Sequence, residues 1–204
     1  MTAFEKKIKE FLSEISEKSK NPNGYAFWES LVAAEKLLQK MPSKKSGKVE
    51  KGVVIKGKVF LSKGAIIKSG VRIEGNLFVG ENSVIGPNSF LRGFVILQKN
   101  CFIGTSEVKN SVFLEDSRAP HFNYIGDSIL CEHVNLGAGT KIANLRHDNE
   151  HIFVQMNGQK VDSMQRKLGA LIGANTKTGI NSSINCGTIV PAGTKILPNQ
   201  FYKK

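Results

Sequence analysis

The strongest candidate for a chemical role in this chain is His121, which lies in the segment 119–124, APHFNY. An imidazole titrates near neutral pH, so this side chain suits a general base that takes a proton from an attacking group. The alternative, on spacing alone, is a histidine in a turn that takes no part in chemistry. Two other parts of the sequence offer residues that could bind a substrate beside it.

Arg92 and Lys109 form the first of these candidate binding features. Each directly follows an aliphatic residue, Leu91 or Val108, so both side chains are expected to point outward. They are 17 residues apart, which would stack them on adjacent coils about 5 Å apart if the chain winds in coils of that length. Two unpaired cations at that spacing predict a phosphate site. The alternative is a pair of solvated surface charges.

The second feature is the segment 135–140, NLGAGT, whose small residues would let a ligand approach backbone N–H groups. A metal is the other chemistry to consider, because His147 and His151 are four residues apart with His133 upstream. Three histidines bind zinc between subunits in the β-helical carbonic anhydrases of the gamma class, so a zinc hydratase is a minor alternative. The spacing fits that arrangement only superficially, and we predict no metal site.

The elements that position these residues follow a repeat of six. Every sixth residue is aliphatic through ten consecutive positions: Val49, Ile55, Leu61, Ile67, Ile73, Val79, Ile85, Leu91, Leu97 and Ile103. Six residues make one short strand and one corner, and three such units close a triangular coil of about 18 residues around an aliphatic interior. We therefore predict a mainly β fold, a left-handed parallel β-helix of hexapeptide repeats over 48–204.

The repeat slips in two places, and loops from a rigid scaffold often carry function. After Ile103 the expected interior residues are Val108 and Leu114, then an irregular piece over 115–123 and a return at Tyr124. A polar excursion is expected at about 144–168, where the repeat is lost. The regular positions resume around it: Leu130, Leu136, Ile142, Ile172, Thr178, Ile184, Val190 and Ile196.

The segment 1–47 has a different pattern. Apolar residues at helical spacing predict amphipathic helices over 4–19 and 25–40, separated by a turn and followed by a Lys-rich linker. The apolar stripes are expected to pack on each other or on the β-helix. The alternative is a helix pair that docks a partner protein or an anionic surface.

Composition limits the classes of function. The chain of 204 residues is 40% hydrophobic and 23% charged, which excludes a disordered chain and a membrane protein. No apolar run approaches the ~18 residues of a spanning helix, and the charged N-terminus lacks a secretory signal. The net charge of +12 favours anionic partners, although no basic stretch with interleaved aromatics indicates nucleic acid. Cys101, Cys131 and Cys186 are expected to be free thiols in the cytoplasm.

Over about 48–198 the sequence resembles the C-terminal acetyltransferase half of GlmU-type bifunctional sugar-1-phosphate nucleotidylyltransferase/N-acetyltransferases. The segments that carry this resemblance are 120–127 (PHFNYIGD), 135–140 (NLGAGT), 143–146 (ANLR), 166–170 (RKLGA) and 177–181 (KTGIN). Nothing before residue 49 resembles the nucleotidylyltransferase half, so we expect no nucleotide-sugar-forming activity.

The resemblance implies a reaction and a role for His121. This residue would remove a proton from the amine of a hexosamine 1-phosphate, and the amine would attack the thioester of acetyl-CoA. The resemblance also implies that Arg92 and Lys109 bind the sugar phosphate and that Tyr124 and Asn135 contact the sugar.

Acetyl-CoA, the expected co-substrate, would by the same resemblance lie near Ala138, Asn144 and Leu145, where a backbone N–H could stabilise the oxyanion. No metal is needed. The family also implies a homotrimer whose sites lie between subunits.

Two positions depart from the family pattern. The lysines that usually follow Asn-Leu-Arg are replaced by 147–153 (HDNEHIF), and Ile180 stands where bacterial members carry serine. Lys160, Arg166 and Lys167 are candidates to supply the missing charge.

The leading hypothesis is thus an N-acetyltransferase acting on glucosamine 1-phosphate, in the synthesis of nucleotide-sugar precursors. One alternative is an acyltransferase for another amino sugar or a longer acyl chain. Another is a non-catalytic trimeric scaffold that serves a separate nucleotidylyltransferase.

Overall fold

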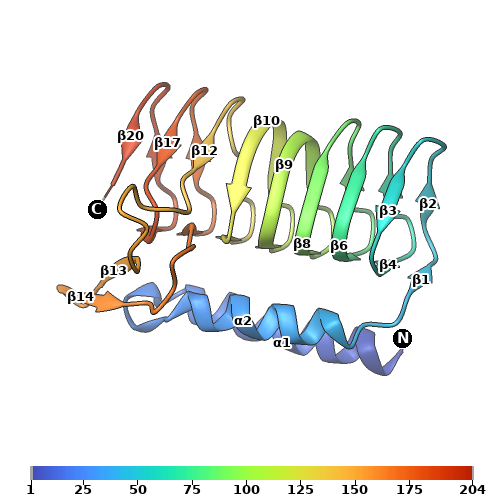
Figure 1. The fold of residues 1–204 in the computed structure, drawn as a ribbon, viewed down its shortest axis with the longest axis horizontal. Helices are drawn as coiled ribbons and strands as arrows, with labels where there is room; N and C mark the ends of the chain where they lie inside the picture. The colour runs from blue at the N-terminus through green and yellow to red at the C-terminus, as the bar shows by residue number, and fades with distance from the viewer. Residues whose placement is uncertain (1, 204) are drawn as a thin grey trace.

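A computed structural model describes residues 2–203. In this range the chain folds into two long helices that lie along one side of a parallel β-helix (Figure 1). The helices are α1 (Ala3–Ser19), the short 3₁₀ helix η1 (Pro22–Gly24) and α2 (Phe27–Gln39). The first strands are β1 (Lys44–Lys45), β2 (Lys48–Val49), β3 (Val54–Lys56), β4 (Val59–Leu61), β5 (Ile66–Ile67), β6 (Arg72–Val79), β7 (Val84–Ile85), β8 (Phe90–Leu97), β9 (Phe102–Phe113) and β10 (Arg118–Gly126). The others are β11 (Ile129–Leu130), β12 (Lys141–Ile142), β13 (Phe153–Met156), β14 (Gln159–Asp162), β15 (Ala170–Ile172), β16 (Lys177–Thr178), β17 (Ser183–Ile184), β18 (Thr188–Val190), β19 (Lys195–Ile196) and β20 (Phe201–Tyr202).

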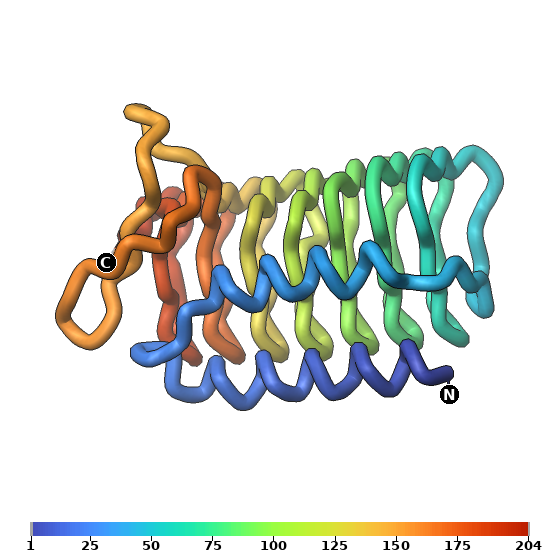
Figure 2. The backbone as a smooth tube through the Cα atoms, turned by 60° about the horizontal axis from the view of Figure 1, so that its bottom comes forward, coloured from blue at the N-terminus to red at the C-terminus, as the bar shows by residue number. Residues whose placement is uncertain are grey.

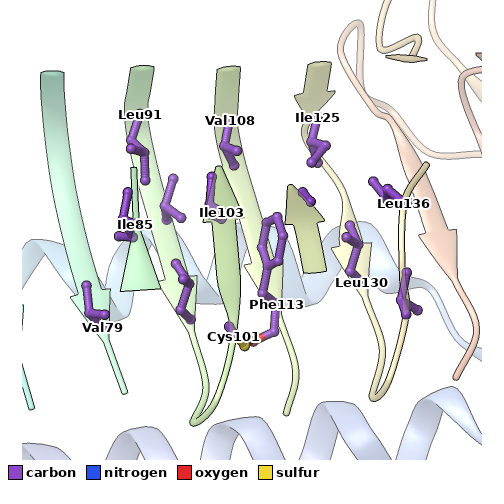
Figure 3. Packing of buried hydrophobic residues seen from close by; sticks show 14 of the residues in the cluster. Val79, Ile85, Leu91, Cys101, Ile103, Val108, Phe113, Ile125, Leu130 and Leu136 are labelled. Atoms are coloured by element: carbon purple, nitrogen blue, oxygen red, sulfur yellow. Dashed lines mark hydrogen bonds between the residues drawn. The ribbon is translucent and has the colours of Figure 1, made fainter. Parts of the chain in front are cut away.

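Parallel pairing between successive coils confirms the predicted left-handed parallel β-helix. In the first half of the body, each residue pairs with the residue 18 positions later, as Ile55 does with Ile73 and Ile73 with Leu91. The side chains at the sixth positions point into the interior, and most are 0–1% exposed (Figure 3). The aliphatic repeat thus forms a continuous core along the axis.

The prediction of which residues fill the interior is wrong where the coils shorten. Ile103 pairs with Ala119, 16 residues on, and Val108 pairs with Ile125, 17 residues on. As a result Phe113 and Ile125 fill the interior, in place of the expected Leu114 and Tyr124. The segment 115–123 is also more regular than expected, because most of it belongs to β10, which bulges between His121 and Tyr124.

The two helices cover one face of the β-helix (Figure 2). Thr2 and Glu5 cap the start of α1 reciprocally, and the buried stripes of α1 and α2 fall at the spacing expected from the sequence. These stripes pack on outward-facing apolar side chains of the body, among them Phe60, Phe78 and Ile96. The helices therefore pack on the β-helix, as predicted, and they bury a second apolar cluster there. No helix within residues 2–203 is long and apolar enough to cross a membrane.

The excursion after β12 forms the antiparallel hairpin β13–β14. Although the segment is polar overall, Ile152, Val154 and Leu168 are buried in the same cluster as α1 and α2. The excursion begins and ends at one point, because Leu145 and Lys167 pair as an antiparallel bridge. We call this point the neck of the excursion.

Candidate functional site

One edge of the β-helix carries His121 and Ala138. The Gly139 N–H donates to the His121 carbonyl at 2.9 Å, and the Asn181 N–H donates to the Ala138 carbonyl at 2.8 Å. These bonds stack His121, Ala138 and Ile180 on three successive coils, about 4.8 Å apart. The candidate base and one residue expected near acetyl-CoA are therefore neighbours.

The bulge in β10 holds His121 in an exposed position. The buried Asn123 side chain accepts from the His121 N–H at 3.2 Å and donates to the Gly137 carbonyl at 2.8 Å. Lys141 Nζ donates to the carbonyls of Phe122 and Gly139, at 2.6 and 3.0 Å. The backbone around His121 is thus fixed from two sides, while its ring forms no hydrogen bond to any of residues 2–203 and stays available to a substrate.

The structure pairs Arg92 with Lys109 on adjacent strands, as the spacing predicts. The expectation that both cations are unpaired is wrong. Arg92 Nη2 lies 2.8 Å from Glu107 Oε1, and Lys109 Nζ lies 2.9 Å from Asp127 Oδ1. Each cation therefore has a carboxylate partner, and the four groups form two neutral pairs.

Asp127 is the centre of a polar network that sequence reasoning missed. Its side chain is only 9% exposed, and it binds Lys109 through both carboxylate oxygens at 2.9 Å. The side-chain amides of Asn110 and Asn144 donate to it at 2.8 and 2.5 Å. Coil spacing was the available clue, because Asp127 comes 18 residues after Lys109 and 17 before Asn144.

Tyr124 joins this network through Asn144. Its hydroxyl donates to Asn144 Oδ1 at 3.2 Å. Burial raises the pKa of the Tyr124 phenol and nearby Arg92 opposes part of the rise, so the group stays a neutral donor at physiological pH. Gly126 makes room for this contact, since a Cβ there would lie 2.6 Å from Asn144 Nδ2 and 3.0 Å from the Tyr124 oxygen.

Asn135 lies apart from these residues. It pairs with Arg118 and Lys177, whereas Tyr124 pairs with Glu107 and Lys141. The edge at His121 separates these two sets of strands, so Asn135 and Tyr124 lie on different faces of the prism. One copy of the chain does not bring them together.

Leu145 is exposed at the neck of the excursion, beside an open pocket. Among the residues that line this pocket are Lys109, Asp127, Leu145, Arg166 and Lys167. Arg166 and Lys167, at the end of the excursion, therefore lie beside the network that holds Lys109 and Asn144. Lys160 lies instead on the hairpin strand β14 and is not among the lining residues.

Two of the three histidines of the zinc hypothesis make other contacts. His133 Nδ1 lies 3.0 Å from Asp116 Oδ2, and His151 Nδ1 lies 3.3 Å from Asp162 Oδ2. Arg118 and then His133 lower the pKa of the Asp116 carboxyl by hydrogen bonding. Among residues 2–203 no group of three His, Cys, Asp or Glu residues is placed to hold a metal ion.

Comparisons with known proteins give sequence relatives that include bifunctional GlmU-type proteins. The bifunctional protein GlmU of Methanococcus maripaludis strain C7 is 55% identical over 173 residues, which cover 84% of this chain and 42% of the relative. A bifunctional sugar-1-phosphate nucleotidylyltransferase/acetyltransferase of Sulfurisphaera tokodaii is 49% identical over 157 residues, covering 76% of this chain and 39% of the relative. GlmU of Methanocaldococcus jannaschii is 43% identical over 189 residues, covering 90% and 46%. The chain thus spans less than half the length of these relatives.

Solved structures give weaker likenesses, and no family model matches the chain. A UDP-N-acetylglucosamine acyltransferase shares 13% identity at a TM-score of 0.31, over 78% of this chain and 65% of that one. A mutant of AntD, a Bacillus cereus N-acyltransferase in complex with dTDP and coenzyme A, shares 14% at a TM-score of 0.31, over 74% and 78%. These likenesses carry no functional assignment. The chain is therefore similar in sequence to one part of the GlmU-type bifunctional proteins, at 43–55% identity over the matched residues.

Proposed function

We propose that the chain is an N-acetyltransferase that transfers the acetyl group of acetyl-CoA to the amine of a hexosamine 1-phosphate, with glucosamine 1-phosphate as the expected acceptor. The observation that carries the proposal is the edge at His121, where an exposed imidazole on a fixed backbone is stacked beside Ala138. The names of the relatives support the reaction class.

In this proposal His121 takes a proton from the sugar ammonium or its attacking amine. The amine nitrogen attacks the thioester carbonyl, the new C–N bond forms, and the C–S bond breaks. The proton is then available to the departing CoA sulfur, so the step balances without a metal. Removal of one general base costs about 10²- to 10⁴-fold in rate.

Sugar-phosphate binding is assigned to Arg92 and Lys109, and sugar contacts to Tyr124 and Asn135. Acetyl-CoA is assigned to Ala138, Asn144 and Leu145. Because Asn135 and Tyr124 lie on different faces of one chain, they can share a substrate only if two copies meet. A homotrimer is therefore part of the proposal.

A cytoplasmic location is also proposed, since Cys101, Cys131 and Cys186 are all free thiols. The test of function is the mass of the product formed from acetyl-CoA and glucosamine 1-phosphate, alongside other amino sugars and longer acyl-CoAs. Product with glucosamine 1-phosphate supports the proposal. Product only with another acceptor or donor would revise the substrate, and binding without any product would favour a scaffold.

A further inference from the structure

The neck of the excursion joins two segments that are distant in sequence. Leu145 pairs with Lys167 as an antiparallel bridge, and the Leu168 N–H donates to the Asn144 carbonyl at 3.1 Å. The backbone of Arg166 and Lys167 therefore runs directly beside Asn144 and Leu145. Any ligand held at Leu145 meets the two cations that close the excursion.

Some of the cations around this pocket have a carboxylate partner and others have none. Lys109 is neutralised by Asp127, and Arg92 on the adjacent strand is neutralised by Glu107. Arg166 and Lys167 are exposed and form no ion pair with any carboxylate of residues 2–203. The pocket thus carries two uncompensated positive charges.

Neighbouring contacts keep these cations free for a ligand. The excursion holds three carboxylates: Asp148 pairs with Arg146, Asp162 pairs with His151, and Glu150 forms no ion pair with Arg166 or Lys167. Arg166 Nε donates to the Asn149 carbonyl at 2.9 Å, which orients the guanidinium and leaves its terminal nitrogens to bind an anion.

We propose that Arg166 and Lys167 form a phosphate-binding subsite at the neck, next to Lys109 and Leu145. Its ligand is a phosphate ester or diphosphate, because guanidinium and ammonium groups beside each other suit that geometry and charge. Two ligands of the proposed function carry such groups, CoA and the sugar 1-phosphate. The choice between these two sources rests on the proposed function, but the subsite itself rests on the geometry of the neck.

The experiment compares the double variant Arg166→Gln/Lys167→Gln with Lys160→Gln, which removes an exposed cation from β14 of the same excursion. Isothermal titration measures binding of CoA, dephospho-CoA, glucosamine 1-phosphate and glucosamine to each protein, prepared as the whole 204-residue chain. A matched melting temperature shows that the variants are folded. Loss of charge-assisted contacts is expected to weaken phosphate-ligand binding about 10- to 100-fold in the double variant and under about twofold in Lys160→Gln.

The pattern of binding losses identifies the ligand of the subsite. Weaker binding of CoA alone assigns the subsite to the acetyl donor, weaker binding of glucosamine 1-phosphate alone assigns it to the acceptor, and loss of both assigns it to a shared position. Unchanged binding in the folded double variant overturns the proposal, as does wild-type protein that binds none of these phosphate ligands. Wild-type protein that binds CoA through these residues yet transfers no acetyl group would refute the proposed function and leave the subsite standing.

Discussion

Lys109 and Asp127 form a closed, mostly buried ion pair between adjacent coils, with Nζ 2.9 Å from both carboxylate oxygens. Asp127 also accepts from Asn144, and Asn144 in turn accepts from Tyr124. One carboxylate therefore ties the residue proposed for the sugar phosphate to residues proposed for the sugar and for acetyl-CoA. The geometry of both halves of the site depends on Asp127.

Removing this carboxylate should destabilise the fold strongly. Asp127→Ala leaves Lys109 without its partner while its side chain is only 13% exposed, and breaking such a buried pair costs about 3–5 kcal/mol. Glu107→Ala breaks the Arg92 pair, whose side chains are 37% and 36% exposed, and should cost about 1 kcal/mol or less. Urea unfolding of the two variants measures the difference. Equal costs would contradict the central place given to Asp127.

The base assigned to His121 can be tested against a second histidine. His121→Ala should lower the acetyl-transfer rate about 10²- to 10⁴-fold, because the attacking amine loses its proton acceptor. His133→Ala is the matched control, since His133 is an exposed histidine on the next coil whose ring contacts Asp116. Its rate should stay within about twofold of wild type. A near-normal rate in His121→Ala would remove that residue from the mechanism.

The docking of α2 should contribute measurably to stability. Leu38 is fully buried against the β-helix side of the cluster, so Leu38→Ala should lower the free energy of unfolding by about 2–5 kcal/mol. Val32 lies on the same helix and is 39% exposed, and Val32→Ala should cost under about 1 kcal/mol. Chemical denaturation compares them. Similar values for both would mean that α2 adds little to the fold.

Buried thiols should make the protein sensitive to alkaline pH. Burial raises the pKa of Cys101 to about 11 and that of Cys131 to about 12, above the ordinary value near 8.5 in an unfolded chain. The thiol contribution to stability is therefore complete below about pH 8.5, and it falls as pH rises through the folded values, because only the unfolded chain releases these protons.

Melting temperatures at increasing pH test this linkage. The decline expected above about pH 8.5 should be shallower in Cys131→Ala than in wild type. In Cys186→Ala it should be nearly unchanged, because Cys186 is only half-buried and desolvation raises its pKa less. Parallel declines in all three proteins would show that other groups control the alkaline limit.

The regular coils could be predicted from the sequence because an aliphatic residue (Ile, Leu or Val) recurs at every sixth position. The prediction held at Val108 and failed at Leu114 and Tyr124, where the coils shorten and adjacent apolar residues compete. Phe113 and Leu114 are both buried, one in the β-helix and one against the helices, so hydrophobicity could not choose between them.

The sequence likewise predicted only part of the candidate site. Coil spacing placed Arg92 beside Lys109. It did not identify their partners, because Glu107 and Asp127 look like solvated polar residues until the side chains are placed. The neck could not be predicted from the sequence either. Leu145 pairs with Lys167 where the excursion rejoins the β-helix, and a segment without a repeat does not indicate that point.

In the proposed function this chain transfers an acetyl group with His121 as the base. The most direct measurement is the time course of N-acetylglucosamine 1-phosphate formed from acetyl-CoA and glucosamine 1-phosphate, read by product mass with wild-type protein and with His121→Ala. Mass avoids the three cysteines, which a thiol dye would report along with CoA. Steady turnover in wild type that falls at least about 10²-fold in His121→Ala is the predicted result. No product from folded wild-type protein that binds both substrates, or equal product from both proteins, would contradict the account.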